Sequence, residues 1–157
     1  MRRQRDGEED MTDEEKIRAN AELVNEQFSA PNIDPSEDDY ARRFGYNYLS
    51  VLRIEQFIEG QRTNPGRTPQ ATENLVEVLG SWLGECILSI YPGAWRWKDN
   101  QLGVFFDDNN AVFPFEKVRK QFEQGVEGGE SILDFFRTVN IFYKRIQREA
   151  EAGDPES

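Results

Sequence analysis

The sequence predicts an α+β fold in which three helices, a three-stranded antiparallel meander and two further helices pack around a central helix at residues 74–91. The central helix is predicted by the stretch NLVEVLGSWLGECILSIY, because its apolar residues recur at the spacing of a helix that buries one face. After Pro92 this spacing gives way to the alternation AWRWK, which is typical of a half-buried strand. Short polar links between the apolar runs that follow favour an antiparallel meander.

The chain before the central helix is expected to contain an acidic tail and two helices. Residues 1–11 are polar, charged and without periodicity, so we predict a disordered tail. Thr12 should cap the first helix, since the sequence TDEE fits a capping box in which Glu15 bonds back to Thr12. This helix is predicted to run to about Phe28, where a segment containing two prolines ends it.

The second helix is predicted over residues 40–60 and is apolar around most of its circumference. A helix of this kind is usually buried, and otherwise has a partner on its second face. We expect it to pack against the face of the central helix that carries Gly80 and Gly84. Pairing with a second copy of the chain is the alternative.

The central helix is expected to be capped by Thr68, with Pro69 at the first helical position. Gly80 and Gly84 are four residues apart and therefore share one face. Each glycine costs about 0.5–1 kcal/mol relative to alanine in a helix interior, so another interaction should offset the cost. We favour close packing against another helix or strand. The alternative is a ligand that lies against the bare backbone beside Glu85.

Three strands are predicted, at residues 94–98, 102–106 and 111–113. The alternation in the first strand places Trp95 and Trp97 on the same face. We expect both indoles to pack on the central helix.

Two helices are predicted to close the chain. The first covers residues 115–124 and ends at Gly125, where a C′ glycine is expected. The second is capped by Ser131 and frays from Glu149, which gives a single domain over residues 12–148 and a disordered tail over residues 149–157. The side of this helix opposite its apolar face gathers four cations: Arg137, Lys144, Arg145 and Arg148.

The formal net charge of -11 is concentrated at the ends of the chain. Residues 1–40 carry thirteen acidic and five basic side chains, residues 147–157 carry four and one, and residues 41–146 carry thirteen of each. This acidity argues against nucleic acid, because phosphate binding needs a basic surface. It favours a basic protein partner, since opposite charge speeds encounter. The acidic residues predicted to bind that partner are Glu37, Asp38, Asp39, Asp107 and Asp108.

The residue types of common catalytic and metal sites are scarce. The chain has no histidine, which removes the commonest general base and the commonest transition-metal ligand. Cys86 lies in the apolar stripe of the central helix and has no histidine to activate it. The turn DDNN at residues 107–110 offers oxygen ligands, but its spacing does not match a calcium-binding loop. Glu73 and Glu77 are expected to lie on a solvated face. We therefore predict no enzymatic activity, no metal and no cofactor.

The expected location is the cytoplasm, without membrane association. No run approaches the roughly 18 apolar residues of a membrane span. The N-terminus has no apolar core of the kind that signal peptides carry, and a single cysteine cannot form an internal disulfide.

One pattern, within residues 79–120, resembles a known family. It consists of Leu79-Gly80 and Leu83-Gly84-Glu85, then Gly93 with Trp95 and Trp97, then Gly103-Val104, and finally Phe113-Pro114-Phe115 before Lys117-Val118 and Lys120. This pattern resembles small, mostly bacterial proteins of unknown function, some of which are proposed as immunity proteins beside polymorphic toxin genes. The resemblance covers about a quarter of the chain and involves mainly structural residues. It therefore implies a shared fold more than a shared activity.

Together these observations predict a non-catalytic cytoplasmic protein that binds other proteins, in its most specific form an immunity-like or antitoxin-like inhibitor of a basic toxin. Two alternatives stay open. One is a homodimeric scaffold or adaptor that uses the second helix. The other is a small-ligand-binding protein that uses the face of Gly80, Gly84 and Glu85.

Overall fold

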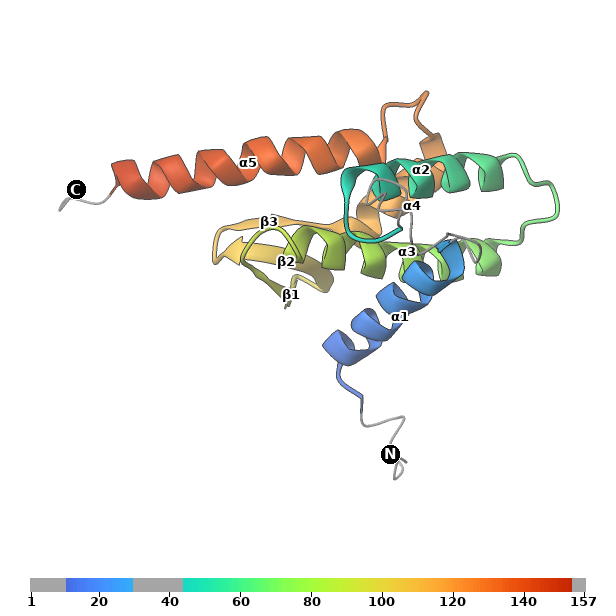
Figure 1. Ribbon diagram of the computed structural model, residues 1–157, viewed down its shortest axis with the longest axis horizontal. Helices are drawn as coiled ribbons and strands as arrows, with labels where there is room; N and C mark the ends of the chain where they lie inside the picture. The colour runs from blue at the N-terminus through green and yellow to red at the C-terminus, as the bar shows by residue number, and fades with distance from the viewer. Residues whose placement is uncertain (1–10, 30–43, 154–157) are drawn as a thin grey trace, which may run out of the picture.

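The computed structural model describes residues 11–29 and 44–153, and it has the predicted α+β architecture (Figure 1). The three strands form one antiparallel sheet in the order β1-β2-β3. The elements in chain order are α1 (Asp13–Phe28), α2 (Tyr48–Arg62), α3 (Pro69–Leu88), β1 (Ala94–Lys98), β2 (Gln101–Asp107), β3 (Asn110–Val112), α4 (Pro114–Gln124) and α5 (Ile132–Ala152).

Helix α3 is the centre of the fold, as predicted. In Figure 1 it lies between α1 on one side and α2, α4 and α5 on the other. Thr68 caps it by accepting the Ala71 amide, and Pro69 occupies its first turn. The helix ends at Leu88, three residues before the predicted end, and a tighter turn follows it. Its buried residues are Val76, Leu79, Gly80, Ser81, Trp82, Leu83, Gly84, Cys86 and Ile87.

The glycine face of α3 is packed against aromatic rings. A Cβ atom on Gly80 would lie 2.5 Å from Cδ1 and 2.9 Å from Cα of Phe115, and one on Gly84 would overlap the indole of Trp95. The expectation that the second helix covers this face is therefore wrong, because α4 and β1 cover it. Close packing, the favoured explanation for the two glycines, is confirmed.

Helix α2 packs instead against α4 and α5, and it buries Val51, Ile54 and Ile58. Asn47 caps its first turn by accepting the Ser50 amide. Residues 44–47 are not helical, so α2 begins later than predicted, and the first predicted residues, 40–43, lie outside the described part of the chain. An asparagine side chain hydrogen-bonds to nearby backbone amides in competition with helical hydrogen bonds. This favours the start of a helix at Asn47 over its continuation.

The sheet confirms the predicted meander but places its two tryptophans differently. A two-residue turn joins β1 to β2, with φ of 52° at Asp99 and 63° at Asn100, as in tight hairpins. Trp95 is buried over Gly84, whereas Trp97 is 60% exposed, so the expectation that both indoles pack on α3 is wrong for Trp97. The indole of Trp97 reaches α1 instead, where its Nε1 donates to Asp13 over 2.9 Å.

The last two helices follow the predicted order. Gly125 ends α4 with a positive φ of 75°, and Ser131 caps α5 by accepting the Asp134 amide. Helix α5 runs to Ala152, so the prediction that the chain frays from Glu149 is wrong. Residues 149–152 alternate glutamate and alanine, which are both strong helix formers.

The packed glycine face predicts the effect of a single methyl group. Gly80→Ala should destabilise the protein by about 1–3 kcal/mol, because the backbone of Phe115 leaves no room for a Cβ. Gly60 provides a matched control in α2, since nothing lies within 4 Å of the corresponding position. Gly60→Ala should stabilise by about 0.5 kcal/mol through helix propensity. Chemical denaturation measures both, and an unchanged or raised stability for Gly80→Ala would contradict the packing.

Candidate functional site

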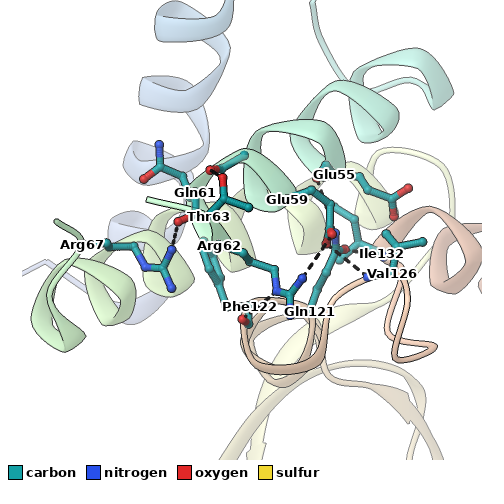
Figure 2. A network of polar contacts seen from close by, with 11 residues as sticks. Glu55, Glu59, Gln61, Arg62, Thr63, Arg67, Gln121, Phe122, Val126 and Ile132 are labelled. Atoms are coloured by element: carbon teal, nitrogen blue, oxygen red, sulfur yellow. Dashed lines mark hydrogen bonds and ion pairs between the residues drawn. The ribbon is translucent and has the colours of Figure 1, made fainter. Parts of the chain in front are cut away.

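Two polar constellations come together in the described part of the chain, and the first joins α2, α4 and α5 (Figure 2). Its centre is the fully buried side chain of Gln121. The Gln121 amide nitrogen donates to Glu59 over 2.9 Å, and its oxygen accepts the Ile132 amide over 2.9 Å. We call this constellation the Gln121 network.

A buried carboxylate completes the Gln121 network at the start of α5. Glu55 accepts the Ser131 hydroxyl and, over 3.2 Å, the Leu133 amide. A carboxylate at a helix N-terminus is stabilised by the exposed amides and by the helix dipole. No buried side-chain polar atom in the described residues lacks a partner. The fully buried polar atoms of the network are therefore all paired within the protein, and the network acts as a structural joint that fixes the loop before α5.

Removal of the central amide should weaken this joint. Gln121→Met keeps the approximate size of the side chain but leaves the Ile132 amide unpaired, and it removes one of the two hydrogen bonds to the Glu59 oxygen that also accepts the Val126 amide. A buried group without its partner costs about 1–3 kcal/mol, so the unfolding midpoint should fall. The exposed Gln124 on the same helix gives the control, because Gln124→Met should change the midpoint little. Equal midpoints for the two variants would show that the network contributes nothing to stability.

The second constellation lines a cleft of about 430 Å³, which we call the cleft. Its walls come from α1, the first half of α3, the β1–β2 hairpin and the start of α4. Four carboxylates and two cations line it: Asp13, Glu73, Glu77, Glu116, Lys16 and Arg119. Trp97 provides an aromatic wall.

One of the two cations is held by carboxylates of the cleft itself. The Arg119 guanidinium donates to both oxygens of Glu73, over 3.0 and 3.3 Å, and to Glu116 over 3.3 Å. These hydrogen bonds lower the pKa of Glu73 below its ordinary value. Arg119 therefore links α3 to α4 and is not free to bind an anion.

The rest of the cleft offers acceptors and an aromatic surface. Asp13 is fixed by the Trp97 indole, while Glu77 is exposed and forms no ion pair with any described residue. The exposed face of an indole attracts cations through its quadrupole. Asn20 and Asn74 add side-chain amides. This arrangement can bind a cationic or hydrogen-bond-donating group.

Neither of the predicted partner-binding residues that the structure describes lines the cleft. Glu37, Asp38 and Asp39 lie outside the described residues. Asp107 is the last residue of β2 and Asp108 follows it, at the end of the strand opposite the β1–β2 turn. Asp107 accepts the Asn110 side-chain amide and the Asn109 backbone amide, which lower its pKa, and Asp108 pairs with Arg96 over 2.9 Å. Both carboxylates of this turn are thus occupied locally.

The glycine face considered for a small ligand is closed. Phe115 covers Gly80 and Trp95 covers Gly84. Glu85 is half-buried and accepts the Trp95 indole N–H over 2.9 Å. Phe115, which covers Gly80, also borders the cleft. The sequence contains one signal for the cleft, which is Trp97. This aromatic residue lies near the end of a strand that extends beyond the glycine face.

The remaining reactive group is buried. Cys86 is inaccessible in α3, and burial raises its pKa to about 12. Within residues 11–29 and 44–153, no three potential metal ligands of the His, Cys, Asp or Glu type gather at one point. None of the helices described there has the length and apolarity that a membrane crossing requires.

The Cys86 thiol should resist labelling in the native protein. A disulfide-exchange reagent at about pH 8 should react with less than one thiol per chain on the timescale of minutes, and with one after denaturation. Because the pKa of the thiol is higher in the folded than in the unfolded chain, the unfolded chain releases its proton first. Stability should therefore fall as the pH rises beyond about 9. Rapid native labelling would show that the α3 core opens readily.

No protein-family model matches the chain, and neither a curated protein nor a solved structure was found to be similar to it. The resemblance to toxin-immunity proteins therefore stays a prediction from the residues between 79 and 120.

Proposed function

We propose that the protein is a non-catalytic binding protein whose cleft receives a basic segment of a protein partner. One observation carries this proposal: the cleft places the exposed indole of Trp97 among carboxylates from three helices. An arginine or lysine side chain can stack on the indole and pair with an acidic group at the same time.

The charge of the cleft supports a cationic ligand. With four carboxylates and two cations, its formal net charge is 2 − 4 = −2. Arg119 is already paired with Glu73 and Glu116, which leaves Asp13 and Glu77 facing the single cation Lys16. The charge of -11 on the whole chain adds a long-range attraction for a basic partner, which increases the rate of encounter.

The more specific form of the proposal is an immunity-like or antitoxin-like inhibitor that acts in the cytoplasm on a basic toxin. It is supported by the acidity of the chain, by the lack of histidine and by the resemblance described above. An inhibitor of this kind needs only a surface complementary to its target, and acts by covering it.

A specific observation favours a small polar ligand as a second candidate. The volume of about 430 Å³ falls within the range of small-molecule sites. The side-chain amides of Asn20, Gln70 and Asn74 could orient such a ligand. A third candidate, the homodimer, is supported by Tyr48 and Leu49 on α2, which are 40% and 43% exposed.

The test compares three baits made from the full chain: the natural sequence, Glu77→Lys and Glu123→Lys. Both substitutions make the same charge change at an exposed glutamate, but only Glu77 lines the cleft. Affinity capture from the native lysate, quantified by mass spectrometry, should yield a basic protein that Glu77→Lys loses and Glu123→Lys retains. Capture should also weaken at high salt, as screening requires.

Different results would decide between the candidates. A protein captured equally by Glu77→Lys and the natural chain would contradict binding in the cleft. A small molecule that copurifies with the natural chain and not with Glu77→Lys, seen by native mass spectrometry, would favour the second candidate. A purified partner that loses its toxicity on stoichiometric mixing would establish the inhibitor form, and one that keeps it would exclude that form.

A further inference from the structure

The second half of α5 has an exposed face that is separate from its packed face. All four buried residues of the helix precede Asn140. Beyond it, Phe142 and Tyr143 are half-buried against Phe106 of the sheet. The opposite face carries five exposed residues at spacings of three and four, which place them on one side of a helix. We call them the α5 stripe: Arg137, Ile141, Lys144, Arg145 and Arg148.

The α5 stripe is positively charged, whereas the chain as a whole is negatively charged. Residues 137–148 contain four cations and no carboxylate, in a chain of net charge -11. Arg137 pairs with Asp134 over 3.5 Å and stacks on Tyr48. Lys144, Arg145 and Arg148 form no ion pair with the described residues. Arg145 lies over the Phe142 ring, 5.8 Å from its centroid, but all three cations lack a described carboxylate partner and can pair with an external acidic group.

Stability of the helix does not account for this pattern. Like charges three or four residues apart, such as Lys144 and Arg148, destabilise a helix. Cations at a helix C-terminus are favourable, but the last turn of α5 carries Glu149 and Glu151 instead. Apart from the Arg137–Asp134 pair, no ion pair among the described residues offsets the repulsion within the stripe.

An apolar residue lies in the middle of the stripe. Ile141 is 65% exposed, the highest value among the large apolar side chains that the structure describes. A single exposed isoleucine is ordinary on a surface. Surrounded by four cations, however, it gives the stripe an apolar centre and a charged border, which is the usual anatomy of a protein–protein interface.

We propose that the α5 stripe docks an acidic segment of a partner protein, with an apolar side chain of that segment covering Ile141. Pairing with the stripe of a second copy is unfavourable, because it would bring four cations against four. Ile141 distinguishes the protein partner from a nucleic acid, since a phosphate backbone offers nothing apolar to cover it. The stripe therefore fits an acidic amphipathic peptide best.

This docking surface is independent of the cleft and goes beyond the proposed function. In Figure 1, α5 and α1 lie on opposite sides of α3, and α1 forms one wall of the cleft. Substitutions in the stripe should leave binding at the cleft unchanged, so failure of one proposal can be told from failure of the other.

The test uses the full chain and a fluorescein-labelled helical peptide of glutamate, alanine and leucine, with one leucine per turn on one face. Fluorescence anisotropy should detect binding that weakens as salt increases. Arg145→Glu and Ile141→Ser should each lower the affinity about tenfold, the first through charge and the second through lost apolar contact. Lys98→Glu, the same charge change on exposed β1, should change the affinity less than about twofold.

Several outcomes would overturn the proposal. Among them are failure of the peptide to bind the natural chain, equal loss in Lys98→Glu and Arg145→Glu, and unchanged affinity in Ile141→Ser. A labelled single-stranded oligonucleotide, measured in parallel, would also overturn it by binding more tightly than the peptide. Because all three substituted side chains are exposed, the variants should keep the unfolding midpoint of the natural chain, and thermal denaturation checks this.

Discussion

Contact between two aromatic rings and the bare backbone of α3 determines where most other elements lie. Phe115 lies on Gly80 and Trp95 on Gly84, and because the glycines are one turn apart, the two rings also meet, with centroids 5.4 Å apart. One ring comes from α4 and the other from β1, so this contact aligns a helix and the sheet on the same surface of α3. The cost of the two glycines in helix propensity is offset by packing that no larger residue would permit. The cleft depends on this alignment, since its walls are the parts of α4 and the hairpin that extend beyond the two rings.

At the start of α5, polar groups rather than aromatic rings fix the positions of the elements. The side chains of Gln121 and Glu55 hold the start of α5 against α2 and α4. Gln121 bonds to Glu59 and to the Ile132 amide (Figure 2), and Glu55 accepts the Leu133 amide. A network of this kind specifies one arrangement, because any displacement of α5 would leave buried groups unpaired. The helix is thus anchored at its first turn, while the exposed face of its second half stays outside the core. The first turn of α5 is therefore fixed to the core and its second half has an exposed face, an arrangement that is suitable for docking.

The sequence predicts the local features of this fold better than its long-range ones. The capping box of Thr12 and Glu15, the Thr68–Pro69 start of α3 and the Ser131 cap of α5 each depend on residues within one turn, and all three are present. Periodicity also identified the glycine face, but it could not identify which element covers it, because that choice depends on chain tracing between distant segments. Alternation placed Trp95 and Trp97 on one face, yet it carries no information on how far α3 extends beneath them. The cleft was not predictable for the same reason: it joins Asp13 to Trp97, which are far apart in the chain.

The three tryptophans occupy very different surroundings, so the intrinsic fluorescence of the protein can report on the cleft. Trp82 is fully buried and Trp95 nearly so, whereas Trp97 is 60% exposed at the wall of the cleft. Emission from the two buried indoles should be blue-shifted and insensitive to aqueous quenchers, while the red edge of the spectrum should come mainly from Trp97. Any occupant of the cleft that covers this ring therefore alters the red edge of the intrinsic spectrum, so that occupancy can be followed on the unlabelled chain.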